Sequence, residues 1–137
     1  MSRTFFAVMK GGNEVPPIIS NASGFTGFVF NRSLTKVSYS LNIANIGKMT
    51  QAHIHAGGPG INGPVVAFLF GQTVPGVSMT AGNVTFSLTK ENLVGPLEGK
   101  TIGDLFILMG SGESYVNVHT EQNPPGEIRG QIEKITR

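Results

Sequence analysis

Apolar and polar residues alternate along much of this chain with a period of two. In segment 37–43 an apolar residue stands at every odd position and serine or asparagine between them. Such alternation is typical of a strand with one face on the core and the other facing water. The alternating segments are short and bounded by Gly, Pro or Asn, which favour turns. They predict eight strands: Thr4–Met9, Gly24–Asn31, Lys36–Ile43, Gln51–His55, Pro64–Phe70, Asn83–Leu88, Tyr115–His119 and Glu127–Ile135.

One segment, Ile102–Met109, has the periodicity of a helix, with apolar residues three and four apart. Thr101 precedes it as a candidate N-cap, Asp104 follows three residues later, and Gly110 ends it. Eight short strands and one short helix predict a single all-β domain over residues 1–137. We expect a Greek-key sandwich or barrel, with the helix closing one end.

The composition narrows the possible functions. Ten basic and eight acidic residues give a net charge of +2, and the basic residues form no stripe of the kind that binds nucleic acid. With no cysteine there are no disulfides, thiolate metal ligands or cysteine nucleophiles. No apolar stretch is long enough to span a membrane, and the first ten residues lack a secretory signal. The compartment stays open: cytoplasmic, cell-surface or a trimmed secreted form.

The three histidines of the chain fall in two predicted strands. Side chains alternate faces along a strand, so His53 and His55 project from one face and Ile54 from the other. In segment 116–119 the two valines share a face, which leaves His119 on the opposite, polar side. If the two strands lie side by side, three imidazoles converge.

A three-imidazole cluster suits a copper or zinc ion. The chain has no fourth histidine and no cysteine to complete a tetrahedral structural site. We therefore expect any bound metal to be exposed or completed by water. Its ligands must be neutral, so binding should weaken as the pH falls through the histidine range. The alternative is that the histidines are structural or incidental.

Other polar residues near these strands are candidates for supporting roles. Asn117 shares the face of His119, and Glu127 and Arg129 share one face of the last strand; these three could bind an anion or orient the histidines. Glu121 could supply an oxygen ligand or orient a histidine ring, or else be a surface carboxylate. Glu14 could also bind an anion or orient the histidines, although a structural ion pair or a solvated face is favoured for it. The same structural role is the alternative for Glu127 and Arg129.

The glycine-rich segment 56–64 directly follows the histidine pair. It has no Lys-Ser/Thr sequence and no helix after it, so it does not match a phosphate-binding loop. We interpret it as a tight connection that uses positive-φ glycines. Because glycine lets the backbone approach closely, the segment could also line the metal site.

Four ordered motifs resemble those of the chordin-type (CHRD) domain family: segments 12–17, 52–66, 115–120 and 126–132. The resemblance covers essentially the whole chain. The family occurs in animal chordin, a secreted antagonist that binds growth factors, and in many bacterial proteins of undefined role. It implies a fold and a set of motifs more firmly than an activity.

A second, weaker resemblance is to copper/zinc superoxide dismutase, an eight-stranded Greek-key barrel. It implies that His53 and His55 match the His-x-His copper strand and that His119 matches a late copper ligand. Arg129 loosely matches the arginine that guides anions to the metal. The bridging histidine, the zinc ligands and the disulfide cysteines of that enzyme have no counterpart here.

Three functional hypotheses follow. The first is a metal-binding barrel that holds copper or zinc through His53, His55 and His119, for storage, buffering or sensing of the metal. The second is a protein- or glycan-binding module of extracellular type with incidental histidines. The third, ranked below both, is a redox enzyme of the dismutase type. Whether the domain is an enzyme stays open, with a non-catalytic role favoured.

Overall fold

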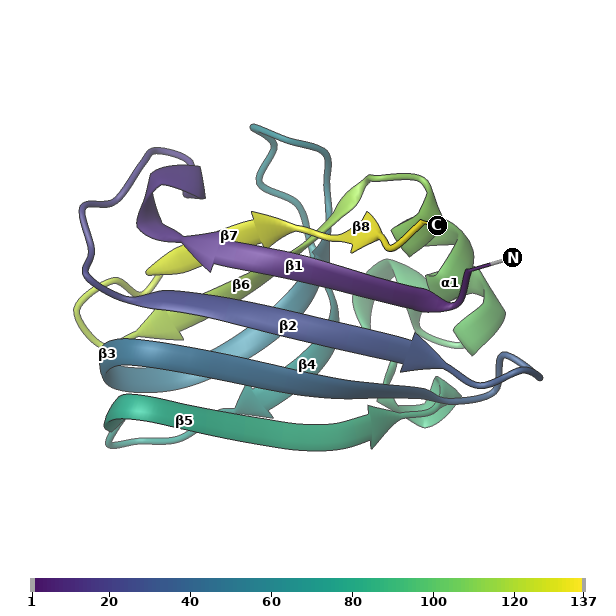
Figure 1. Ribbon diagram of the computed structural model, residues 1–137, viewed down its shortest axis with the longest axis horizontal. Coiled ribbons are helices and arrows are strands. Elements are labelled where there is room, and N and C mark those ends of the chain that lie inside the picture. The colour runs from purple at the N-terminus through teal and green to yellow at the C-terminus, as the bar shows by residue number, and fades with distance from the viewer. Residues whose placement is uncertain (1, 137) are drawn as a thin grey trace.

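A computed structural model describes residues 2–136 of the chain, so Met1 and Arg137, the ends of the expected domain, lie outside the described residues. Eight strands and one α-helix form this part of the chain (Figure 1). The number of strands equals the predicted number, although several boundaries differ. Short 3-10 turns lie at 11–13, 90–92 and 95–97. The elements are β1 (Thr4–Lys10), β2 (Ser23–Phe30), β3 (Val37–Ala56), β4 (Val65–Gly71), β5 (Val77–Leu88), α1 (Ile102–Gly110), β6 (Ser114–Thr120), β7 (Ile128–Gln131) and β8 (Glu133–Lys134).

Five of the strands close into a barrel through antiparallel pairing. β1 pairs with β2, β2 with β3, β3 with β6 and β6 with β7. The ring closes where β7 meets β1, at the pair Lys10 and Arg129. β4 and β5 pair with β3 outside this ring, and β8 pairs with β1. The expected all-β barrel is therefore confirmed.

The long strand β3 corrects the expected boundaries, because two predicted strands are one strand of 20 residues. Its first half pairs with β2 and β5, and its last residues pair with β4 and β6. Asn45 and Lys48 have φ of 55° and 54°, and the register shifts between Ile46 and Met49. These residues look like a turn in the sequence, but here they form a bulge that bends the strand without ending it.

Two other strands also differ from expectation. β5 begins at Val77, six residues before the expected Asn83. The last predicted strand is divided into β7 and β8 at Ile132, whose N–H donates to the carbonyl of Ser114. The pairing partner of the chain changes here, because β7 pairs with β6 whereas β8 pairs with β1.

The barrel interior holds the apolar rows of the strands. Ile54, Val116 and Val118 are fully buried, which confirms the facing predicted for both histidine-bearing strands. Because alternate residues point to opposite faces, the histidines of β3 and β6 must lie on the outer face of the barrel wall.

Helix α1 closes one end of the barrel, as expected (Figure 1). Phe106 packs edge-on against Phe5 and Phe30, with ring centroids 5.7 and 5.1 Å apart. Thr101 Oγ1 accepts from the Asp104 N–H, and Asp104 accepts from the Thr101 N–H, which confirms the capping box. In residues 2–136 no helix is both long and apolar enough to cross a membrane.

The outer face of β3, β6 and β7 is covered by loops, although its residues are polar. The segments 11–22, 57–64 and 121–127 lie over it, joined to it and to each other by hydrogen bonds such as Asn62 Nδ2 to the Val15 carbonyl and Gln131 Nε2 to the Gly57 carbonyl. The covered polar residues are Glu14, His53, His55, Asn117, His119, Thr120, Glu127 and Arg129. The domain therefore has a buried polar layer outside its apolar core.

Candidate metal centre

The register between β3 and β6 brings the three histidines together. Residues opposite each other on neighbouring strands have Cβ atoms about 5 Å apart. On the covered face, Gln51 lies opposite His119, His53 opposite Asn117, and His55 opposite Tyr115. The imidazoles thus come from adjoining positions of two hydrogen-bonded strands.

The three rings converge as predicted. One ring nitrogen from each histidine lies within 4.8 Å of those of the other two. His53 Nδ1 and His119 Nε2 are 3.1 Å apart. A tetrahedral ion with bonds of 2.0–2.1 Å needs nitrogens about 3.4 Å apart. To reach that spacing from 4.8 Å, the most widely separated nitrogens must approach by about 1.4 Å.

Two backbone carbonyls set the tautomers of His55 and His119. His55 Nδ1 donates to the Gly63 carbonyl at 2.9 Å, and His119 Nδ1 donates to the Pro124 carbonyl at 2.8 Å. A carbonyl can only accept, so Nε2 of each ring keeps its lone pair. Carbonyls in this position are typical partners of metal-binding histidines.

In His53 the two ring nitrogens exchange places, so that Nδ1 faces the cluster and Nε2 faces Gln51. Its Nε2 lies 3.0 Å from Gln51 Oε1, which leaves Nδ1 without a proton when the amide oxygen accepts. His53 Nδ1 and His119 Nε2 are 3.1 Å apart, so they form a hydrogen bond when the His53 proton is on Nδ1 and face each other as two lone pairs when it is on Nε2. In the second of these tautomers both nitrogens could bind a metal ion.

One ring nitrogen in the cluster has no hydrogen-bond partner. Among the described residues, His55 Nε2 is buried and unpaired. An unsatisfied buried polar atom costs about 1–3 kcal/mol. A metal ion would satisfy it, so the donor set fits a metal by the chemistry of the residues themselves.

The three histidines are buried, so an exposed metal, one of the two alternatives expected, does not fit their placement. His53, His55 and His119 are each less than one-tenth exposed. Burial, with repulsion from the other two imidazoles, lowers the pKa of His53 to about 3. Burial also lowers the pKa of His55 and of His119. All three rings are therefore neutral at pH 7, as metal binding requires, and proton competition begins below the ordinary histidine range.

Aromatic rings hold two of the imidazoles in place. Phe68 meets His53 edge-on, with centroids 4.3 Å apart. Tyr115 stacks on His55 at 4.7 Å with an interplanar angle of 5°. The guanidinium of Arg129 lies 3.5 Å from the centroid of Tyr115. These contacts limit ring rotation and keep water away.

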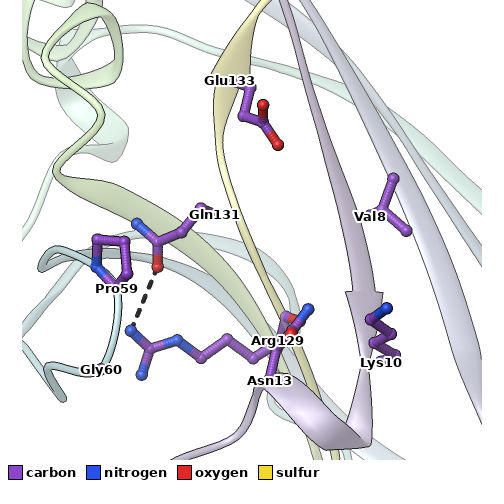
Figure 2. Close-up of a pocket in the computed structure, with 8 residues that line it drawn as sticks. All are labelled: Val8, Lys10, Asn13, Pro59, Gly60, Arg129, Gln131 and Glu133. Atoms are coloured by element: carbon purple, nitrogen blue, oxygen red, sulfur yellow. Dashed lines mark hydrogen bonds between the residues drawn. The ribbon is translucent and has the colours of Figure 1, made fainter.

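Arg129 is fully buried and holds the glycine-rich loop to the barrel wall. Its Nη2 donates to the carbonyls of Gly58 and Ile61, and its Nη1 donates to Asn62 Oδ1. Nη2 also donates to Gln131 Oε1 (Figure 2). This loop carries the carbonyl that orients His55. All four acceptors are neutral, so the ion pair considered for Arg129 is absent from the described residues.

Glu127 holds the other covering loop. Ser20, Asn123 and Thr120 donate to its carboxylate. Burial raises the pKa of Glu127, but these hydrogen bonds outweigh it and leave the pKa below its usual value. The loop contains Pro124, whose carbonyl orients His119, so Glu127 supports the site indirectly.

Glu121 is not part of the cluster. Its carboxylate accepts from the Gly76 N–H, in the loop before β5. The His119 ring nitrogen outside the cluster is bonded to the Pro124 carbonyl instead. Glu121 is exposed and does not contact a histidine ring in this structure, as expected of a surface carboxylate.

Glu14, for which the sequence favoured a structural ion pair or a solvated face, is buried. Asn117 Nδ2 donates both to Glu14 Oε2, at 2.5 Å, and to the Ile128 carbonyl. Burial raises the pKa of Glu14 to about 7, although Asn117 and the charge of Arg129 oppose the shift. Among residues 2–136 Glu14 forms no ion pair, and its side chain is not solvated, so neither favoured arrangement is present.

Replacing Glu14 with glutamine is expected to stabilise the domain above neutral pH. A folded-state pKa of about 7 against 4.5 unfolded means that stability falls as the pH rises from 4.5 through 7, by up to about 3 kcal/mol. Glu14→Gln keeps an acceptor for Asn117 and removes this loss. Urea unfolding should show a gain of about 2–3 kcal/mol at pH 8 and little change near pH 4.

The matched control is Glu98→Gln, at an exposed position, which should leave the pH profile unchanged. A Glu14→Gln protein that loses stability between pH 4 and 8 as steeply as the wild type would show that Glu14 ionises freely.

Comparison with known proteins identifies the family. No curated protein matches the chain. The family model described as the CHRD domain matches residues 5–132, which span β1 to β7 and include the three histidines, Glu14 and Arg129. The chain therefore belongs to the CHRD domain family.

Proposed function

We propose that this domain binds one copper or zinc ion through His53, His55 and His119 in a non-catalytic role. The observation that carries the proposal is a buried set of three converging imidazoles, one of which has an unpaired Nε2. Burial keeps the rings neutral. Two backbone carbonyls accept from Nδ1 of His55 and His119, so that Nε2 of each ring presents its lone pair to the cluster.

The donor atoms favour a particular group of ions. Three imidazole nitrogens suit copper and zinc better than the hard ions calcium and magnesium, which prefer oxygen. Copper would supply a redox-active centre, and zinc would supply a Lewis acid. The fourth position is left for water or a group from a partner molecule.

Storage, buffering or sensing of metal fits the chain better than dismutation. All three histidines of the sequence belong to one cluster, so none remains to bridge to a second metal. The loop at 57–63 carries no His, Asp or Cys that would hold one. We therefore expect little superoxide dismutation from the copper-loaded protein.

A protein- or glycan-binding role is the second candidate. It is favoured by apolar side chains on the outer face of β1 and β2: Val8, Phe25 and Val29 are 51%, 45% and 53% exposed. Exposed apolar groups that lie close together are typical of interaction surfaces. Such a role does not require the histidines to bind metal.

Calorimetric titration of tag-free protein with Cu(II) and Zn(II) tests the proposal. We expect one ion per wild-type chain and an affinity at least about 100-fold lower for His119→Ala, since one of three ligands is lost. Gln122→Ala, on the same covering loop, is the control and should bind as the wild type does. Unfolding with chelator present checks that each variant is folded.

Three results would overturn the proposal or part of it. Absence of saturable binding by the wild type would leave the interaction role in its place. Equal affinities of the wild type and folded His119→Ala would remove the three-histidine site. A high dismutase rate in the copper-loaded wild type would contradict the non-catalytic role.

A further inference from the structure

A polar pocket lies beside Arg129 and the glycine-rich loop, and no histidine lines it. It has a volume of about 410 Å³. Arg129, stacked on Tyr115, forms part of its wall, and Lys10 forms another part (Figure 2). The remaining lining residues are Val8, Asn13, Pro59, Gly60, Gln131 and Glu133.

The two cations of this pocket are direct neighbours across the sheet. Lys10 and Arg129 are register partners on β1 and β7. Their charged ends point apart, with the guanidinium of Arg129 extended toward Gln131 and Pro59, so the two cations lie on different sides of the pocket (Figure 2). Within residues 2–136, Arg129 donates only to neutral oxygens, and neither cation pairs with a carboxylate.

No carboxylate of the described chain fully balances the buried charge of Arg129. Glu14 senses it, since Arg129 lowers the pKa of Glu14, but burial dominates and holds that pKa at about 7. Glu14 is thus only about half ionised at neutral pH. An unpaired buried guanidinium carries a desolvation cost of several kcal/mol, so an added anion would be stabilised here.

Both cations keep donors for a ligand. A guanidinium has five N–H groups, and the hydrogen bonds of Arg129 use only Nη1 and Nη2. Its Nε–H has no hydrogen-bond partner among the described residues, and Nε is not completely buried. The exposed ammonium of Lys10 adds three donors.

One acid lines the pocket as well. The carboxylate of Glu133 lies at the opposite end from the Arg129 guanidinium (Figure 2). It would repel an anion, and it therefore offers a test in the direction opposite to that of Lys10.

We propose that this pocket binds a small oxyanion with two negative charges, such as a phosphate group or a dicarboxylate, between Lys10 and Arg129. Lys10 and Arg129 carry two positive charges and unused N–H donors, which match an anion with two negative charges. A planar guanidinium recognises oxyanions by paired hydrogen bonds. The site is separate from the histidine cluster, and its occupation does not depend on a bound metal.

Titration of the metal-free protein with inorganic phosphate and with succinate, followed by NMR or calorimetry, tests this site. We expect one saturable site whose affinity falls about tenfold in Lys10→Ala and rises several-fold in Glu133→Gln, since local charge changes by one in each. Lys100→Ala, an exposed lysine elsewhere, is the control and should bind as the wild type does. Arg129 is left intact because it holds the glycine-rich loop.

The two probes distinguish the chemistry of the anion, since tighter phosphate binding identifies a phosphoryl group and tighter succinate binding a dicarboxylate. Absence of saturable binding of both would overturn the proposal. Equal affinities in Lys10→Ala, Glu133→Gln and Lys100→Ala would also overturn it.

Discussion

Replacing Val118 with aspartate is expected to unfold the domain or to lower its free energy of unfolding by more than about 4 kcal/mol. Val118 is fully buried on the inner face of β6, opposite Ala52 of β3. An aspartate there must either bury an unpaired charge or take up a proton without a hydrogen-bond partner. Both alternatives carry the desolvation cost of a buried polar group.

Circular dichroism and urea unfolding measure this effect. Val29→Asp is the matched control, because Val29 lies on the outer face of β2 and is 53% exposed. It should cost about 1 kcal/mol or less. A Val118→Asp protein as stable as the wild type would mean that β6 faces the other way, and that His119 does not lie beside His53.

Acidification is expected to destabilise the metal-free protein through His53. The folded-state pKa of about 3 lies far below the value of 6.5 for a free histidine. Below pH 6.5 the unfolded chain takes up a proton that the folded chain refuses, so stability falls as the pH falls. The loss from His53 is about 2 kcal/mol at pH 5 and about 4 kcal/mol near pH 3. The lowered pKa values of His55 and His119 act in the same direction.

Glu14 opposes this trend, because its raised pKa makes the fold more stable as the pH falls from 7 to 4.5. The measurement is therefore made in the Glu14→Gln background, by urea unfolding with chelator at pH 7, 6 and 5. Adding His53→Gln should make the pH dependence clearly shallower. Equal slopes with and without His53 would show that this ring is protonated in the folded state.

Local pattern was sufficient for much of the fold and for the choice of metal-site residues. Alternation assigned Ile54, Val116 and Val118 to the interior, and so placed all three histidines on the opposite face. The helix at 102–110 and its capping box follow from contacts within a few residues, which neighbouring sequence specifies.

The same reasoning failed where pairing partners decide the structure. The residues 45–48 have the chemistry of a turn, yet β5 and β6 pair on either side of them and keep β3 continuous. Side-chain alternation cannot show such pairing, because the partners are distant in the sequence.

By itself, the sequence determined which residues share a face; the tertiary structure alone decided what covers that face. Asn117 binds Glu14 from 103 positions away, and Arg129 holds the loop at Gly58 from 71 positions away. These contacts turn an expected water-facing surface into a buried polar layer with neutral histidines and a half-ionised carboxyl. Alternation of apolar and polar residues specifies only the face to which each side chain points. The burial and the pKa of a side chain depend on every segment that the closed barrel brings over the site.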